Sequence, residues 1–172
     1  MVPELSPPRA LLDLGAGGGV PGLALALAWP ACRVVLLDAS SRRCAFLQGA
    51  LHELGLEATG AVAHGRAELL ARDPVLAGAF DLVTARSFAP PGTTAECGVR
   101  FLAADGLLVV SEPPDPADVA DRWPSDGLAS LGLGAAEPLN AAGWHVVRIP
   151  LVSSCPEQYP RRDGVPAKRP LF

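Results

Sequence analysis

The sequence has few aromatic and few charged residues. Aromatic residues make up only 5% of the chain and charged residues 19%, against 49% hydrophobic residues. This balance excludes a disordered chain and predicts a globular core built mainly from Leu, Val and Ala. At 172 residues the chain is long enough for one full core and too short for two comfortable domains.

Cysteine and positive charge are also scarce. The four cysteines, Cys32, Cys44, Cys97 and Cys155, are scattered, with no C-x-x-C pair and no partnered histidine. We therefore expect no metal site and no disulfide framework. The net charge of −4 argues against a surface that is positive overall for nucleic acid, although it leaves room for a local basic patch.

An uninterrupted membrane span is absent too. Residues 14–32 are nineteen consecutive uncharged positions, but seven of them are Gly or Pro, so no continuous spanning helix is plausible. The first residues lack the basic and apolar regions of a signal peptide. We expect a cytoplasmic protein with no membrane contact.

What is present is an alternation of strand-like and helix-like segments. It predicts an α/β fold with a doubly wound, mostly parallel, Rossmann-like sheet in one domain over 1–172. A surface connection is expected over 112–127, a weak signal follows over 128–140, and a basic, Pro-rich extension without a helix begins at about 153. The expected strands are 10–14, 33–38, 58–63, 80–85, 106–111 and 144–152, and the expected helices are 23–28, 41–54, 66–72 and 93–104.

The glycine-rich segment between Asp13 and Gly22 follows the first expected strand and precedes a helix. Glycines there let the backbone turn sharply and approach a ligand. The segment also fits the G-x-G-x-x-G pattern of NAD enzymes, but Gly15 directly follows the strand and Pro21 lies inside the would-be phosphate cradle. Asp38, at the end of the second strand, can accept both hydrogens of a ribose diol.

Five stretches in this order resemble the RsmG (GidB) family, the guanine-N7 methyltransferases of bacterial small-subunit (16S) ribosomal RNA. They are Asp-Leu-Gly-Ala-Gly-Gly-Gly-Val-Pro-Gly at 13–22, Leu-Asp-Ala-Ser-Ser-Arg-Arg-Cys-Ala-Phe-Leu at 37–47, Gly-Arg-Ala-Glu at 65–68, Thr-Ala-Arg-Ser-Phe-Ala at 84–89, and the tail 159–171. The resemblance implies a class I S-adenosylmethionine (SAM)-dependent methyltransferase. Its expected partner is ribosomal RNA or the small ribosomal subunit, and it is expected to act as a monomer.

The resemblance also implies a set of site residues. Guanine N7 has a free lone pair and no proton to lose, so no general base is expected; Arg66 and Arg86 are expected to position the reactants, and His64 to be structural or solvent-facing. The expected cofactor residues are Asp13, Gly15, Gly17, Gly19, Val20, Asp38, Ala67, Glu68 and Arg86, and the expected RNA contacts are Arg161, Arg162, Lys168 and Arg169.

Three features depart from the family pattern. The family has a helical segment before its first strand, which this sequence lacks; Ser111-Glu112 replaces a usual Lys-Gly; and Ile149–Val152 lacks the usual closing Lys. A paralogue with another substrate, or a catalytically silent SAM-binding module, therefore remains an alternative. The tail after Pro160 is expected to be separable, so that its deletion weakens RNA binding and spares SAM binding.

Overall fold

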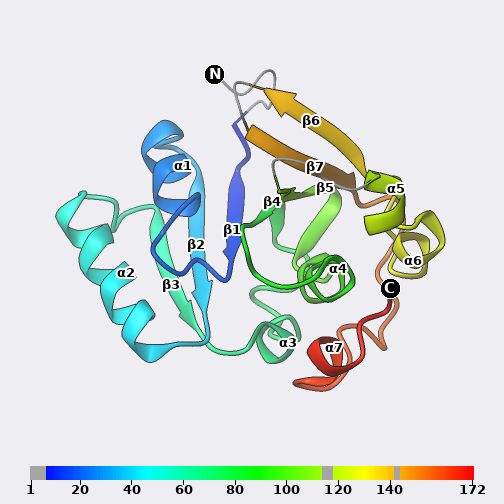
Figure 1. Ribbon diagram of the computed structural model, residues 1–172. Coiled ribbons are helices and arrows are strands. Elements are labelled where there is room, and N and C mark those ends of the chain that lie inside the picture. The colour runs from blue at the N-terminus through cyan, green and yellow to red at the C-terminus, as the bar shows by residue number, and fades with distance from the viewer. Residues whose placement is uncertain (1–6, 114–117, 142–143) are drawn as a thin grey trace.

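A seven-stranded sheet forms the centre of the protein (Figure 1). The computed structural model describes residues 7–113, 118–141 and 144–172. The strand order is β3-β2-β1-β4-β5-β7-β6; β1 to β5 pair in parallel, and β7 runs antiparallel to both β5 and β6. The predicted doubly wound, mostly parallel sheet is thus confirmed. The strands are β1 Ala10–Leu14, β2 Arg33–Asp38, β3 Gly60–His64, β4 Phe80–Ala85, β5 Leu102–Ser111, β6 Glu137–Ala141 and β7 Trp144–Pro150.

Helices cover both faces of this sheet. Figure 1 shows α1 and α2 on one side and α3 and α4 on the other. Successive strand residues point to opposite faces, so Leu11 and Leu36 pack in the α1–α2 cluster while Leu12 and Leu37 pack in the other. The helices are α1 Gly22–Ala28, α2 Ser41–Glu53, α3 Ala67–Leu70, α4 Pro91–Val99, α5 Val119–Arg122, α6 Ser125–Ser130 and α7 Val165–Lys168.

Local signals account for the boundaries of α2. The Ser40 hydroxyl accepts a hydrogen bond from the Arg43 N–H, as an N-cap should, and Gly55 follows the helix with a φ of 67°. The helix predicted over 41–54 is thus confirmed to within one residue. No helix in the described part of the chain is long and apolar enough to cross a membrane.

The region between β4 and β7 corrects several predictions. The helix predicted to run to residue 104 ends at Val99, and β5 begins at Leu102, four residues before the predicted 106. An irregular stretch explains the difference: Asp105 has a φ of 61°, and the β4–β5 register shifts between Phe80 and Leu82. The early part of β5 pairs with β4, and this long-range contact overrides the helix propensity of its alanines.

The predicted surface connection is in part a packed structure. It contains α5 and the start of α6, and the Trp123 side chain between them is 2% exposed. Strand β6 was not predicted; it is an edge strand, where Pro138 is tolerated because an edge leaves some N–H groups unpaired. Residues 114–117 of the predicted connection lie outside the described residues.

Candidate functional site

The strand registers bring the predicted cofactor residues to one edge of the sheet. Leu14 of β1 pairs with Leu37 of β2 and with Ala85 of β4. The residues that directly follow these three strand positions therefore lie side by side at the carboxyl ends of the strands. They are Gly15 after β1, Asp38 at the end of β2 and Arg86 after β4. Ligands of open α/β sheets bind at this edge.

The glycine loop has a backbone that only glycine adopts readily. Gly15, Gly17 and Gly19 have φ values of 70°, 55° and 86°. A Cβ on Gly15 would lie 2.5 Å from Cδ2 of Phe88, whereas a Cβ on Gly18 would meet nothing within 4 Å. The loop is therefore closely packed against the segment that follows β4 and open above Gly18, which gives a ligand room to approach the backbone.

Hydrogen bonds within the protein already occupy much of the loop's N–H capacity. The N–H groups of Ala16, Gly17 and Gly19 donate to the Leu37 carbonyl, the Asp38 carboxylate and the Ala16 carbonyl. The N–H of Gly22 donates to Asp13, and Pro21 before it has no N–H. Few donors remain for a pyrophosphate, and a carboxylate faces the loop. These features suit an uncharged adenosine better than a dinucleotide phosphate.

Asp38 joins the loop to the next helix. Its Oδ2 accepts from the Gly17 N–H at 2.9 Å and its Oδ1 from the Ser40 N–H at 2.8 Å. Arg43 lies 3.6 Å away in an ion pair that is exposed on the arginine side. A carboxylate has about four lone-pair positions, so each oxygen can still accept one hydroxyl of a ribose. The residues present therefore fit the adenosine half of SAM.

Asp13 lies beneath the loop, where its side chain is 1% exposed. Oδ2 accepts from the Gly22 N–H at the start of α1, and Oδ1 accepts from the Thr84 hydroxyl on β4. Burial raises the pKa of Asp13 to about 6, although both hydrogen bonds and the charge of Arg86 act to lower it. This geometry gives Asp13 a positioning role, in which it ties β1, α1 and β4 together under the cofactor loop.

We expect an Asp13→Asn variant to lose part of the pH dependence of stability. The folded pKa lies above the ordinary value of 3.8, so the folded state binds the proton more tightly, and the resulting stability is lost as pH rises through about 6. As the pH rises from 5 to 8, deprotonation of Asp13 should lower the free energy of unfolding of the wild type by about 1.4 kcal/mol. Urea unfolding of both proteins measures the difference. Parallel curves for the two proteins would contradict the raised pKa.

The remaining predicted cofactor and positioning residues differ in exposure and in hydrogen bonding. Ala67 and Glu68 begin α3 and are 4% and 3% exposed. The Arg66 guanidinium donates to Glu68 and to Asp163 of the tail, both at 2.9 Å, so its charge is committed to two carboxylates. Arg86 is exposed directly after β4, and Val20 is 43% exposed in the loop. Arg86 is thus better placed than Arg66 to meet a ligand.

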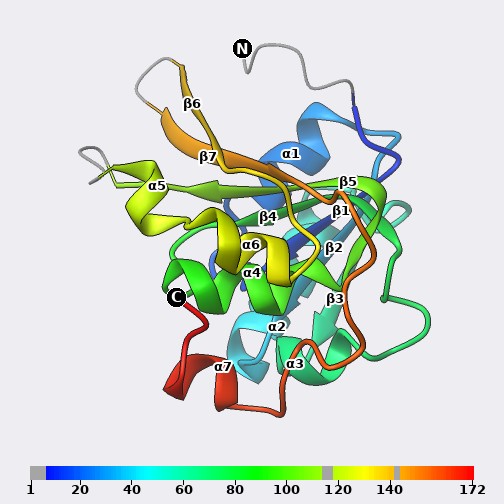
Figure 2. The same ribbon diagram turned by 90° about the vertical axis from the view of Figure 1, so that its right-hand side faces the viewer.

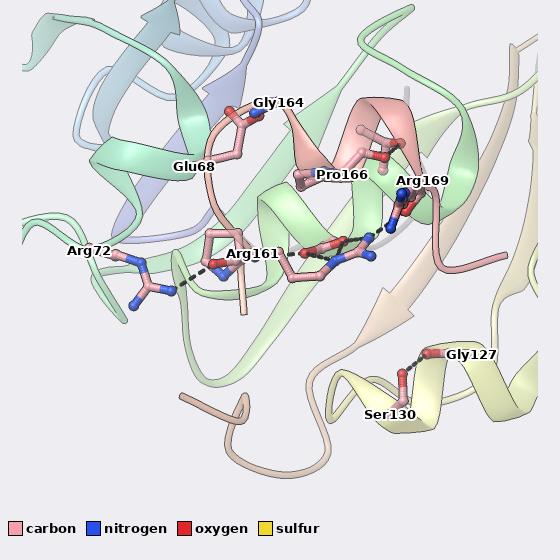
Figure 3. A network of polar contacts seen from close by, with 11 residues as sticks. Glu68, Arg72, Gly127, Ser130, Arg161, Gly164, Pro166 and Arg169 are labelled. Atoms are coloured by element: carbon pink, nitrogen blue, oxygen red, sulfur yellow. Dashed lines mark hydrogen bonds and ion pairs between the residues drawn. The ribbon is translucent and has the colours of Figure 1, made fainter. Parts of the chain in front are cut away.

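The tail packs against α3 and α4, and its expected separability for SAM binding stays a prediction. Arg161 donates its backbone N–H, Nε and a terminal nitrogen to Glu96, a residue of α4 that is 0% exposed (Figure 3). The Gly164 N–H donates to Glu68, the Arg72 guanidinium donates to the Pro160 carbonyl, and Thr93 donates to the Pro166 carbonyl. The tail is an integral layer over α3 and α4.

Arg161 consequently differs from the other three predicted RNA residues. Its guanidinium holds the buried Glu96 and also donates to the Arg169 carbonyl. The side chains of Arg162, Lys168 and Arg169 are exposed on and around α7, which Figure 2 shows at the end of the molecule that carries α2 and α3. Three of the four predicted RNA residues are therefore exposed, whereas the guanidinium of Arg161 is bonded to other groups of the protein.

Three structurally important residues were missed from the sequence. Thr84 holds Asp13, Glu96 anchors the tail, and Trp123 donates its indole N–H to Glu112. The acidic Glu96 inside an otherwise apolar and small-residue helix was the one available signal, because a buried carboxylate requires a partner.

Comparison with known proteins identifies related sequences. A family profile described as rRNA small subunit methyltransferase G matches residues 1–113. A relative named ribosomal RNA small subunit methyltransferase G, from Parasynechococcus marenigrum (strain WH8102), is 36% identical and covers 95% of this chain and 68% of its own. The protein of that name from Prochlorococcus marinus (strain MIT 9313) is 37% identical with the same coverage.

A solved structure supports the fold. The crystal structure of cofactor-bound Rv0187 from MTB is 25% identical, with a TM-score of 0.59, over 86% of this chain and 74% of that protein. The sequence profile spans well over half of the chain, and the relatives exceed 30% identity over nearly all of it. The chain therefore belongs to the rRNA small subunit methyltransferase G (GidB) family.

Proposed function

We propose that this chain transfers a methyl group from SAM to guanine N7 of small-subunit ribosomal RNA. The observation that carries the proposal is the meeting of the glycine loop, Asp38 and Arg86 at the carboxyl edge of the sheet, in a chain of this methyltransferase family. Asp38 would hold the ribose and Arg86 the methionine carboxylate, while the open backbone above Gly18 would admit the adenosine.

In the proposed reaction the side chains mainly position the two reactants. Bound at this site, SAM supplies an electrophilic methyl group on a sulfonium. Guanine N7 has a lone pair in the plane of the ring, so no side chain has to remove a proton before the methyl group is transferred. His64 lies at the carboxyl end of β3, and its side chain is exposed. The task left to the chain is to hold the cofactor, exclude water and present the base.

The RNA surface that we propose consists of Arg86 and the exposed tail residues Arg162, Lys168 and Arg169. These side chains can contact phosphates, which position the RNA without reading its sequence. A guanine must be unstacked to reach the edge of the sheet, so a loop or an assembled particle is the expected target. We propose a monomeric, single-domain enzyme that acts in the cytoplasm, where ribosomal subunits are assembled.

Methyl transfer to isolated subunits tests the proposal directly. We expect label from methyl-labelled SAM to enter the ribosomal RNA of unmethylated small subunits. Reduction followed by aniline treatment cleaves the RNA backbone at N7-methylguanosine. This cleavage should map the label to one guanine. Label at a different atom or in a different molecule would favour a paralogue with another substrate. SAM binding without transfer to any subunit would favour a silent binding module.

Arg86→Ala should weaken the enzyme's grip on SAM. Loss of a charge-assisted hydrogen bond to the methionine carboxylate is expected to raise the Kd for SAM by roughly 10- to 100-fold. The matched control is Arg42→Ala, which removes an exposed arginine from α2 at the same edge of the sheet. Calorimetric titration of the three proteins with SAM gives the comparison. Equal Kd values for both variants would remove Arg86 from the cofactor site.

A further inference from the structure

A second feature of the carboxyl edge is a cavity of about 290 Å³ beside the cofactor loop. Residues after β4 and at the end of β5 line it, together with two residues of the α5 region, Arg122 and Trp123. Its volume is near the lower end of the roughly 300–1,000 Å³ found for small-molecule pockets, which suits a single base. A larger cavity of about 560 Å³ lies at the start of β5 and the end of β7, away from the cofactor edge.

Phe88 lies between the cavity and the glycine loop. This residue lines the cavity, and its ring lies so close to Gly15 that a Cβ there would be 2.5 Å from Cδ2. The strand order places β4 between β1 and β5, so the cavity is one strand further along the edge than the cofactor loop. A base in the cavity is therefore a neighbour of the cofactor.

The polar wall of the cavity is an acid held in place. The Glu112 side chain is 2% exposed; its Oε2 accepts from Arg122 Nε at 2.6 Å, and its Oε1 accepts from Trp123 Nε1 at 3.1 Å. Trp123 in turn packs edge-on against Phe172 of the tail, with ring centroids 6.5 Å apart. The carboxylate is fixed from two sides, and each oxygen keeps lone-pair capacity for a further donor.

We propose that this cavity is the subsite for the target guanine and that Glu112 selects it; the inference rests on the proposed function. Guanine presents two adjacent donors, N1–H and the N2 amino group, which a carboxylate can accept together. Adenine presents a lone pair at N1, which the carboxylate repels. Arg122 has N–H donors besides the Nε–H bonded to Glu112 and can serve guanine O6, while Phe88 and Trp123 supply aromatic surface for the base.

Replacing the target guanosine by inosine in the subunit RNA tests the proposal with the unchanged enzyme. Inosine keeps N7 and N1–H and lacks only the N2 amino group. We expect kcat/KM for methyl transfer to fall roughly 10- to 100-fold with inosine, because one carboxylate oxygen loses its donor. Equal transfer to guanosine and inosine would overturn the assignment of Glu112, while methylation of the natural RNA would still uphold the proposed function.

The Glu112→Gln variant gives an independent readout. It should lower kcat/KM for the natural RNA roughly 10- to 100-fold and reduce the preference for guanosine over inosine to less than threefold, with the Kd for SAM within twofold of wild type. The matched control is Asp121→Asn, an exposed acid on the same short helix, which should retain the full preference. An unchanged preference in Glu112→Gln would overturn the proposal. Absence of transfer to natural RNA by the wild type would instead overturn the proposed function.

Discussion

An Arg161→Ala substitution should destabilise the protein by roughly 3–5 kcal/mol. The reason is Glu96, which is 0% exposed and receives hydrogen bonds from the Arg161 backbone N–H, Nε and a terminal nitrogen. Without the guanidinium, a carboxylate remains buried in α4 with a single backbone donor. Because a domain is typically stable by only about 5–15 kcal/mol, this one change threatens the fold.

The neighbouring arginine is the matched control for this experiment. Arg162 is exposed, so Arg162→Ala should change the unfolding free energy by no more than about 0.5 kcal/mol. Urea unfolding gives both values. If Arg161→Ala costs as little as Arg162→Ala, the tail is not anchored by this ion pair.

The same substitution in a Glu96→Gln protein separates the cost of the buried charge from the cost of the lost arginine packing. In a Glu96→Gln protein no unpaired carboxylate is left behind, so the cost of Arg161→Ala should fall to about 1 kcal/mol. A cost that stays at its wild-type value would assign the effect to the arginine's packing and to its bond with the Arg169 carbonyl.

The same contacts show why the sequence misjudged the tail. Its basic residues and prolines indicated an RNA-binding extension without a helix, whereas Val165–Lys168 form α7 and the segment packs on α3 and α4. Its partners, Glu68, Glu96 and Thr93, lie between 65 and 96 residues away in the chain. A pattern read within a short window carries no information about pairings at that separation.

Where the signals were local, the sequence was sufficient. The strands β1, β2 and β4 have the predicted bounds, because each is a short apolar run ended by a turn or an acid. The glycine loop and Asp38 also meet as predicted, since the end of one parallel strand lies beside the end of the next. The early start of β5 was missed because a register shift opposite β4 decides it, and no residue pattern marks that shift.

The sequence predicted which residues belong to the candidate site, and the structure shows which of their side chains are bonded to other groups of the protein. Asp13 and Arg66 occur in the motifs, yet the carboxylate of Asp13 and the guanidinium of Arg66 are engaged by other protein groups. The sequence departs from the family pattern at Ser111-Glu112, where a Lys-Gly pair is usual. The structure places Glu112 in the lining of a cavity beside the cofactor loop, where its carboxylate can accept hydrogen bonds from a base.

The largest effect on ligand binding is expected from Asp38→Ala. Loss of the carboxylate removes two acceptors from the cofactor ribose, and SAM affinity should fall by about 1–3 kcal/mol, or roughly 5- to 150-fold. The same carboxylate holds the Gly17 and Ser40 N–H groups, so the variant also loosens the loop. A change in SAM affinity alone therefore does not separate ribose recognition from loop geometry.

A ligand that lacks one hydroxyl makes this separation. We expect wild-type protein to bind S-adenosylhomocysteine at least several-fold more tightly than its 2′-deoxy analogue, because a carboxylate that accepts two hydroxyls loses one of them. The Asp38→Ala variant should bind the two ligands equally, and Arg43→Ala, which removes only the exposed ion-pair partner, should keep the wild-type preference. Calorimetry with the two ligands and three proteins measures all six affinities. If Asp38→Ala retains the preference for the ribose, Asp38 acts only on the loop, and another group at the carboxyl edge must bind the diol.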